Sequence, residues 1–287
     1  MMHGAMVDEA GKESVSDVQI KSFNTKSGKN LATVYFTDKW AESKIKAPLD
    51  KIDIVIANGA VPIIRLQNSD DPDGGSGKAG KYSHQNIIDG KWDKELKQYA
   101  VDLGNRNVLI EYGTEINGDW FDWSLEGPEK FKKAFRYISK ILNRKLVFHV
   151  DATDNNKSPK WYPGDDVCCL VGTSCYGGYG SGRGCVTTLA KIYKDFASIS
   201  ETIPLAILEW GAPEAKNIKF NVQDTIDTLR DMPQYDRIVL LQRWAEKIIP
   251  GHSEDEIGDG RIDVTPEMLK AYREGIANPV YTSKFIL

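Results

Sequence analysis

Hydrophobic positions along the chain fall into short runs that alternate with longer amphipathic stretches. Most of the short runs are almost continuously apolar, as in residues 205–208, which is typical of strands buried on both faces of a parallel sheet. We predict a β-strand for each of these runs, which cover residues 18–23, 31–36, 61–67, 107–113, 145–151, 166–176, 204–211 and 237–244.

The stretches between the runs repeat apolar residues at helical spacing. Three of them show one continuous apolar face, and they cover residues 92–103, 131–142 and 189–196. Thr265 followed by Pro266 is a typical start for a last helix. Alternating strands and helices over roughly 250 residues are the size of a TIM barrel. We therefore predict one α/β domain, a (β/α)8 TIM barrel at residues 17–287, preceded by an N-terminal tail at residues 1–16.

A doubly wound α/β fold is the competing architecture. Such folds usually bind dinucleotides through a G-x-G-x-x-G turn, and the glycine-rich segment 172–184 never has this spacing. The pair Gly77 and Lys78 also lacks the earlier glycine of a phosphate-binding loop. The barrel is therefore favoured.

The composition predicts a folded protein and argues against a nucleic-acid or membrane partner. Of 287 residues, 41% are hydrophobic and 27% are charged, with a net charge of -4. This charge argues against binding by phosphate neutralisation. No apolar run approaches the ~20 residues that span a bilayer, and the first residues lack the layout of a secretory signal. We expect a monomer with neither a nucleic-acid nor a membrane partner.

The four cysteines lie close together between Cys168 and Cys185. They never show the paired C-x-x-C spacing of a structural zinc site, so metal ligation is not expected. Cys168 and Cys169 lie in an apolar run and are interpreted as buried thiols. Cys175 and Cys185 can close a loop in an oxidising compartment, and the sequence leaves this pairing open.

Two predicted strands end in glutamates with tryptophans nearby. The run 107–113 leads into Glu115, Asn117, Trp120 and Trp123, and the run 204–211 ends with Glu209 and Trp210. In a TIM barrel the carboxyl ends of the strands build the active site. Cleavage of a glycosidic bond needs one protonated carboxyl group and one ionised carboxylate. We therefore predict that Glu115 and Glu209 form a catalytic pair, beside aromatic rings that offer apolar faces to a sugar.

Three segments together resemble glycoside hydrolase family 26. They are EINGDWFDW at residues 115–123, WYPGDD at 161–166 leading to Tyr176, and PLAILEWG at 204–211, and they occur in the order of that family. The family contains chiefly β-mannanases, with some β-glucanases and β-1,3-xylanases. The resemblance implies a (β/α)8 barrel whose acid/base follows the fourth strand and whose nucleophile ends the seventh.

The resemblance also implies a role for individual residues. Glu115 would be the general acid/base and Glu209 the nucleophile of a retaining double displacement. Tyr176 would hydrogen-bond the nucleophile, and Trp120 and Trp123 would shape the sugar platform. No cofactor and no metal is implied, because two carboxylates and water suffice for this chemistry.

The chain departs from the family at two positions before the acid/base. The family usually has histidine immediately before the acid/base and arginine four residues before it, whereas this chain has Thr114 and Glu111. A glutamate in place of an arginine reverses the local charge. The change allows an altered substrate, a relocated partner such as Arg65 or Arg243, or lost catalysis.

Other side chains at predicted strand ends are open to two interpretations. Trp210 and Trp244 are either sugar contacts or barrel packing. His149 ends the fifth strand as a structural histidine or a sugar contact, and Arg65 with Gln67 closes the third strand in the same way. All but Gln67 are included in our predicted substrate-binding set.

Two loops are expected beside the predicted site. Residues 70–81 are expected to form a flexible rim or lid, and their acids lack the full spacing of a calcium loop. Residues 177–184 follow the sixth strand, where they would line a sugar site or form a mobile turn.

The leading hypothesis is an endo-acting, retaining β-glycoside hydrolase that acts on a β-linked polysaccharide or oligosaccharide. β-Mannan is the first candidate substrate, followed by β-1,4 or mixed-linkage β-glucan. The alternatives are a weakened or inactive carbohydrate-binding protein on the same barrel and a glycosidase of another family of clan A. For a polysaccharide-degrading hydrolase we expect a secreted or cell-surface location.

Overall fold

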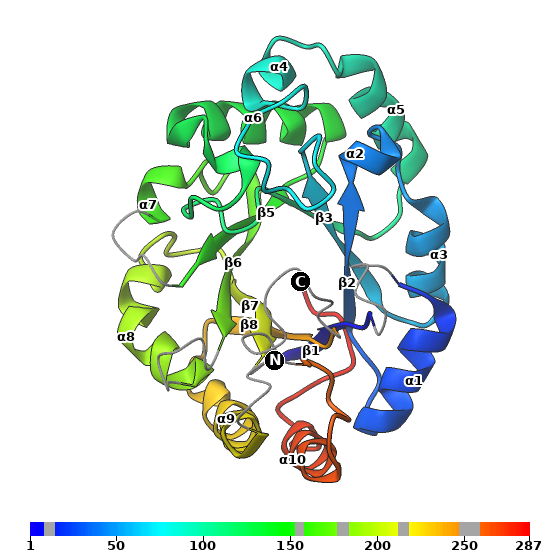
Figure 1. The fold of residues 1–287 in the computed structure, drawn as a ribbon, viewed down its shortest axis with the longest axis vertical. Helices are drawn as coiled ribbons and strands as arrows, with labels where there is room; N and C mark the ends of the chain where they lie inside the picture. The colour runs from blue at the N-terminus through cyan, green and yellow to red at the C-terminus, as the bar shows by residue number, and fades with distance from the viewer. Residues whose placement is uncertain (9–14, 153–157, 177–183, 212–217, 247–258) are drawn as a thin grey trace.

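The computed structural model describes residues 1–8, 15–152, 158–176, 184–211, 218–246 and 259–287. Its centre is a closed barrel in which eight strands follow one another in chain order (Figure 1). Neighbouring strands are parallel throughout, and β1 pairs with both β2 and β8. The strands are β1 (Met2–Met6), β2 (Thr33–Lys39), β3 (Val61–Gln67), β4 (Leu109–Tyr112), β5 (Leu146–Asp151), β6 (Cys168–Tyr176), β7 (Leu205–Gly211) and β8 (Ile238–Trp244).

Helices surround the barrel, and their bounds follow the predicted apolar faces (Figure 1). The α-helices are α1 (Asp17–Ser27), α2 (Trp40–Ser43), α3 (Leu49–Ala57), α4 (His84–Ile88), α5 (Asp93–Leu103), α6 (Gly127–Leu142), α7 (Ser158–Trp161), α8 (Cys185–Ala197), α9 (Ile218–Asp231) and α10 (Pro266–Ile276). Short 3-10 turns lie at Asp122–Ser124 and Met232–Gln234. As predicted, the Thr265 side chain caps α10 by accepting from the Met268 N–H. The predicted TIM barrel is confirmed.

The first predicted strand is wrong, because residues 18–23 belong to α1. Ser16 caps this helix by accepting from the Gln19 N–H, and the following acidic residue favours a helix N-terminus. Val18 is 74% exposed, whereas Ile20 and Phe23, three residues apart, are buried. That spacing belongs to a helix packed on one side.

The first barrel strand is β1, which lies inside the predicted N-terminal tail. The boundary of the tail at residue 16 is therefore also wrong. All five residues of β1 are buried, and the strand closes the barrel by pairing with β8 from Met2 to Met6. Its sequence MHGAM is short and contains His3 and Gly4, so the apolar run lacks the length and the branched side chains that mark the other strands.

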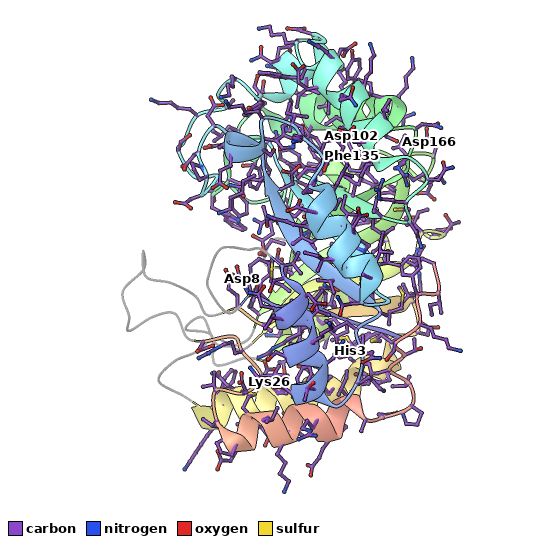
Figure 2. The ribbon with its side chains drawn as sticks, turned by 90° about the vertical axis from the view of Figure 1, so that its right-hand side faces the viewer. His3, Asp8, Lys26, Asp102, Phe135 and Asp166 are labelled. Atoms are coloured by element: carbon purple, nitrogen blue, oxygen red, sulfur yellow. A yellow bond between two sulfur atoms is a disulfide. The ribbon has the colours of Figure 1, made fainter. Side chains whose placement is uncertain are left out.

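Side chains fill both the barrel and the layer outside it. Inside the barrel, large apolar residues from several strands meet, including Met2, Tyr35, Ile63, Leu240 and Trp244. Outside it, a larger cluster joins the strands to the helices. Figure 2 shows the side chains of this outer layer, in which His3 and Phe135 are buried and Asp166 is exposed. Polar residues lie at the carboxyl ends of the strands.

Gly4 makes room for a buried polar contact inside the barrel. The Thr33 hydroxyl donates to Gln242 Oε1 at 2.7 Å, and a Cβ atom on residue 4 would collide with both side chains. We expect Gly4→Ala to lower the free energy of unfolding by roughly 1–3 kcal/mol, because overpacking also breaks this hydrogen bond. Denaturant unfolding measures the change.

Gly75→Ala is the matched control for this prediction. The nearest heavy atom to a Cβ at position 75 is the main-chain oxygen of Trp120 at 3.6 Å, which is ordinary contact. Its free energy of unfolding is expected to change by less than about 0.5 kcal/mol. Equal effects of the two substitutions would contradict the close packing at Gly4.

Candidate active site

Three glutamates gather at the carboxyl ends of the barrel strands. Glu111 lies within β4, Glu115 follows β4 after a short turn, and Glu209 lies in β7. A β-bulge aims Glu209, since Thr173 pairs with Ile207 but the next residue of β6 pairs with Glu209. The bulge thus turns one β7 carboxylate toward side chains of β2, β3 and β6.

Glu209 is buried and receives contacts from three strands. The Tyr176 hydroxyl donates to Glu209 Oε2 at 2.9 Å, and Arg65 Nη1 lies 3.9 Å from Oε1. The Tyr35 hydroxyl lies 3.4 Å from the same Oε1. Burial raises the pKa of Glu209 to about 7, with Glu115 adding to the rise and Arg65 opposing it. The predicted contact from Tyr176 is present, and Arg65 is the cation beside the carboxylate.

Glu115 stands on a constrained turn. Its φ of 48° lies in the left-handed region, which is uncommon for a residue with a side chain. The Trp120 indole N–H donates to Glu115 Oε2 at 2.8 Å. Burial raises the pKa of Glu115, and the charge of Asp151 raises it further, against an opposing effect of His149. A raised pKa suits a carboxyl group that must deliver a proton.

Glu111 is completely buried and is surrounded by hydrogen-bond donors. Tyr35 donates to its Oε2 at 2.7 Å, Thr114 donates to its Oε1, and His149 Nδ1 lies 3.0 Å from the same Oε1. Burial disfavours the charge of Glu111, but His149, Thr114 and Arg65 outweigh burial and lower its pKa. The two departures from the family, Glu111 and Thr114, therefore bond to each other.

Two of the predicted aromatic residues lie beside these groups. Trp120 is 45% exposed and bonds Glu115, so its ring is accessible next to the carboxyl group. Trp244 lies 5.9 Å from the Arg65 guanidinium and 6.1 Å from the Tyr35 ring. Phe121, which the predicted set left out, is half-buried and lies 5.4 Å from Arg65. Two aromatic rings thus lie beside the Arg65 guanidinium.

The other two tryptophans of the predicted set are buried and make packing contacts, which for Trp210 is the second of the two interpretations. Trp123 is buried under the stacked ring of Phe121, and its N–H donates to the main-chain oxygen of Thr114. Trp210 is completely buried outside the barrel, where it stacks on Tyr272 of α10. Trp210 faces outward because it follows Glu209 in β7, and successive side chains of a strand point to opposite faces.

Asn117, His149 and Arg243 also have fixed places. The Asn117 amide bonds the main chain of Asp151 in both directions, which ties the turn after β4 to the end of β5. His149 lies inside the barrel between Glu111 and Ser174, so its contacts are structural. Arg243 donates to the Gly260 main-chain oxygen and lies over the Trp210 ring, outside the glutamate cluster. Of the two suggested relocated partners, only Arg65 faces the glutamates.

Tyr35 and Ser174 are the site residues that sequence reasoning missed. Tyr35 contacts two of the glutamates, and Ser174 bonds His149 Nε2 at 2.9 Å. A usable signal for Tyr35 is the alternation in β2, where Thr33, Tyr35 and Thr37 take every second position of an apolar strand. No comparable signal in the sequence marks Ser174. Its place opposite Glu209 depends on the β-bulge between β6 and β7.

The loop at residues 70–81 is tethered, which differs from the expected flexible rim or lid. The buried Asp122 carboxylate accepts four hydrogen bonds at 2.6 to 3.2 Å, from the hydroxyls of Ser69 and Ser76 and from the N–H groups of Gly77 and Lys78. Gln67 contributes as well, since its amide donates to the Pro72 oxygen at 2.6 Å. The loop after β3 is therefore fastened to the segment that carries Trp120.

Removing the Asp122 carboxylate is expected to release this loop. In Asp122→Ala, amide hydrogen exchange at residues 69–78 should accelerate by on the order of tenfold or more, because each hydrogen bond to a charged group is worth about 1.5–3 kcal/mol. Hydrogen exchange followed by mass spectrometry measures the change. Asp73→Ala, an exposed acid in the same loop, is the control and should leave exchange unchanged. Slow exchange in both variants would contradict the tether.

Of the predicted loop at 177–184, residues 177–183 lie outside the described residues, and Gly184 is the N-cap of α8. The structure joins Cys175 and Cys185 in a disulfide with Cα atoms 5.1 Å apart, which answers the pairing that the sequence left open. Burial raises the pKa of the remaining thiols, Cys168 and Cys169, so both are poor nucleophiles. Among the described residues, no group of three metal-ligating side chains converges.

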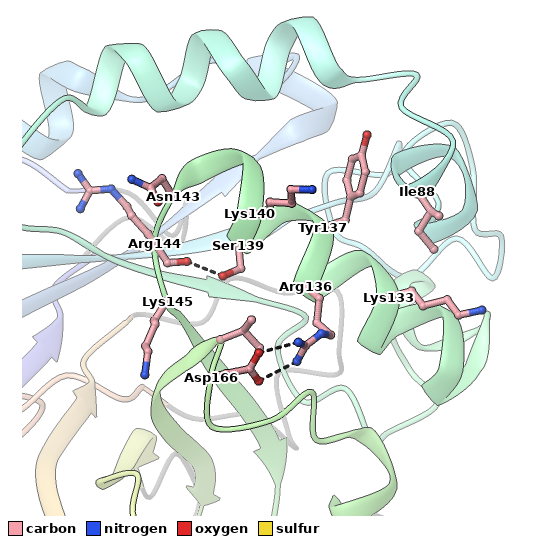
Figure 3. A pocket seen from close by; sticks show the side chains of 11 residues that line it. Ile88, Lys133, Arg136, Tyr137, Ser139, Lys140, Asn143, Arg144, Lys145 and Asp166 are labelled. Atoms are coloured by element: carbon pink, nitrogen blue, oxygen red, sulfur yellow. Dashed lines mark hydrogen bonds and ion pairs between the residues drawn. The ribbon is translucent and has the colours of Figure 1, made fainter.

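A cavity of about 730 Å³ lies away from the glutamates, between α6 and the segments that enter β5 and β6 (Figure 3). Its lining is rich in lysine and arginine, and several of these groups are engaged. Arg136 bonds both oxygens of Asp166, at 2.8 and 2.6 Å, and Arg144 donates to the Gly104 oxygen. These contacts fasten α6 to neighbouring segments and bring no reactive groups together.

Comparison with known proteins places this geometry in context. Residues 78–212 match the model of glycosyl hydrolase family 26. Endoglucanase H of Acetivibrio thermocellus is 24% identical over 285 residues, which cover 91% of this chain and 29% of that protein. A mannan endo-1,4-beta-mannosidase of Thermothelomyces thermophilus is 30% identical over 63 residues, 22% of this chain and 13% of that protein. The chain therefore spans less than a third of the length of either curated relative.

The solved structures show the same architecture. A family 26 β-mannanase from Bacteroides ovatus superposes with a TM-score of 0.67 and 16% identity, covering 98% of this chain and 90% of that chain. The barrel and its glutamates define the class of (β/α)8 barrels that gather carboxyl groups at the carboxyl ends of their strands. The resemblance found in the three sequence segments is confirmed. The segment that matches the family model contains both Glu115 and Glu209.

Proposed function

We propose that the protein is an endo-acting β-glycoside hydrolase that retains the anomeric configuration, with Glu209 as nucleophile and Glu115 as acid/base. The observation that carries the proposal is the pair formed by half-buried Glu115, which follows β4, and buried Glu209 in β7, in different environments. Glu209 has the guanidinium of Arg65 and the hydroxyl of Tyr176 beside it, whereas Glu115 has the indole N–H of Trp120. Separate environments suit separate roles.

The first step of the proposed reaction forms a covalent intermediate. Ionised Glu209 attacks the anomeric carbon while Glu115 gives its proton to the departing glycosidic oxygen, so one C–O bond forms as another breaks. Arg65 and Tyr176 hold the attacking carboxylate in position. In the second step Glu115 takes a proton from water, and the resulting hydroxide oxygen displaces Glu209 from the sugar.

The surrounding rings suit a carbohydrate. Trp120 is accessible beside Glu115, and Phe121 and Trp244 flank Arg65 beside Glu209. Aromatic faces pack against the C–H groups of a sugar ring. These three rings are the proposed platform next to the cleaved bond.

β-Mannan is the first proposed substrate, because the matched family contains chiefly β-mannanases and one similar protein is named a mannan endo-1,4-beta-mannosidase. A β-1,4-linked glucan is the second. It is favoured by the similarity to endoglucanase H, which extends over 91% of this chain.

A location outside the cytosol fits the proposed substrate. The disulfide between Cys175 and Cys185 supports it, since such bonds persist in oxidising compartments. None of the described helices is long and apolar enough to cross a membrane. We propose that the protein is secreted or held at the cell surface and acts as a monomer.

Reducing-sugar release from a panel of polymers tests the function. The panel contains galactomannan, glucomannan, mixed-linkage β-glucan, carboxymethylcellulose and β-1,3-xylan, each incubated with the protein and with Glu209→Gln. Release from mannan or glucan that is lost in the variant is the expected result. Binding of an oligosaccharide without release from any polymer would instead establish a carbohydrate-binding protein.

A further inference from the structure

A continuous row of polar side chains links Glu209 to Glu115 inside the barrel. It begins at Tyr35, which lies 2.7 Å from Glu111 and 3.4 Å from Glu209. It continues from Glu111 through His149 at 3.0 Å to Ser174 at 2.9 Å. The row reaches Glu115 through the Ser174 hydroxyl, which acts to lower the pKa of that carboxyl group. Neither Glu111 nor His149 has a part in the bond-making steps proposed above.

The hydrogen-bond partners of Glu111 and His149 indicate which atoms of this row carry protons. Three donors surround Glu111, namely Tyr35, Thr114 and His149, and an ionised carboxylate is the form that accepts from all three. His149 must therefore carry a proton on Nδ1. His149 Nε2 lies 2.9 Å from the Ser174 hydroxyl, whose oxygen can accept from it. With both ring nitrogens donating, the ring is an imidazolium, a form that its buried partner Glu111 and the raised pKa of His149 favour.

We propose that His149, held as a buried imidazolium by Glu111, is a positioning residue that sets the pH range of the two catalytic glutamates. It is the second cation of the cluster after Arg65. With Glu115 protonated, the two cations balance the charges of Glu111 and Glu209. The buried cluster is then neutral in the form that starts the reaction, which lowers the cost of burying it.

The groups that face His149 agree with this assignment. Glu111 comes from β4, Glu115 from the following turn, Glu209 from β7, Ser174 from β6, and Tyr35, Arg65 and Asp151 complete the surroundings. Burial disfavours a charged ring, but Glu111 outweighs burial and the pKa of His149 is raised, with Glu209 and Glu115 adding to the rise. In turn His149 opposes the rise in the pKa of both Glu115 and Glu209. Where the family has an arginine, this chain has Glu111, which favours the protonated form of His149 on β5.

Glu111→Gln tests the proposal with little change of shape. The amide oxygen of glutamine can still accept from Tyr35 while its NH₂ group donates to a neutral His149, so the hydrogen bonds remain and both charges are lost. Histidine-selective nitrogen NMR should show His149 protonated on both nitrogens throughout roughly pH 5 to 8 in the native protein and neutral at pH 7 in the variant. The alkaline limb of the kcat/KM profile, which reports Glu115, should move to higher pH by about one unit. The acid limb should move less, because Glu209 loses the opposing effects of His149 and Glu111 together.

Ser174→Ala separates the two ends of the row. His149 keeps its partner Glu111 and should stay charged, while Glu115 loses one donor to its ionised form. Only the alkaline limb of the profile, which reports the acid/base, should move upward. Asp38→Asn is the control, since it changes a buried acid bonded to Tyr99 rather than to this row. It should leave the profile of kcat/KM unchanged.

The inference on kinetics rests on the proposed function, and the NMR measurement separates the two. A native His149 that loses a proton between about pH 5 and 8 would overturn the inference even if the protein hydrolyses mannan. A charged His149 that becomes neutral in Glu111→Gln supports the inference even if the native protein hydrolyses no polymer. Unmoved kinetic limbs in an active Glu111→Gln variant would also overturn it.

Discussion

Glu209→Ala is expected to lose hydrolysis of its polymer by on the order of 10⁴-fold or more, because no other group can form the covalent intermediate. Arg65 and Tyr176 would remain around the emptied position. A small anion such as azide can occupy that space and attack an activated aryl β-glycoside from the same side as the lost carboxylate. The product should be the α-glycosyl azide, whose configuration NMR identifies.

Tyr176→Phe is the matched control for this variant. It keeps the Glu209 carboxylate and removes one donor, so kcat/KM should fall far less, by about tenfold, and azide should have no effect. Thermal unfolding of both variants shows whether the barrel is intact. A Glu209→Ala protein that keeps polymer hydrolysis would refute its role as nucleophile. A β-configured azide product would also do so, by assigning the lost group to the other face of the sugar.

Glu115→Ala is expected to slow polymer hydrolysis by about 10²–10⁴-fold, because the departing oxygen of a polysaccharide needs a proton. An aryl glycoside with an acidic phenol needs no such help, so its first step should be spared. The second step then becomes slow, and the glycosyl group should accumulate on Glu209. Mass spectrometry of the quenched protein detects this added mass, and azide should release the β-glycosyl azide.

Asp119→Ala is the control, because it removes an exposed acid from the same segment. It should neither accumulate the intermediate nor change hydrolysis of the polymer. Equal losses on polymer and on aryl glycoside in Glu115→Ala would contradict the acid/base role. Such a result would move that role to a neighbouring carboxyl group, of which Asp151 is the one whose charge acts on Glu115.

Most of the barrel can be predicted from the sequence because its strands are buried on both faces. Residues 61–67 coincide with β3, and the other late strands match the predicted runs to within about two residues. The exception is β1, whose five residues include a histidine and a glycine. A strand this short carries too few branched side chains to stand out, and its identity depends on contacts with β2 and β8.

From the sequence, the residues of the candidate site could be predicted only where they stand at the end of a strand. Glu115, Glu209, Tyr176 and Arg65 could be found, because each stands at the carboxyl end of a strand. The burial of Trp123 and Trp210 could not, since it depends on Phe121 and on α10. The contacts among Glu111, His149 and Tyr35 also join separate strands, so no local pattern records them.

The pairing of β1 with β8 has a consequence for the synthesis of the protein. Met2 lies beside Leu240 in the finished barrel, so the first strand made must wait for the last one. Until then one edge of β1 has open hydrogen-bonding groups, which can pair with another chain. Contacts between such distant residues also slow folding. The nascent barrel is therefore exposed to aggregation until β8 has been made and can pair with β1.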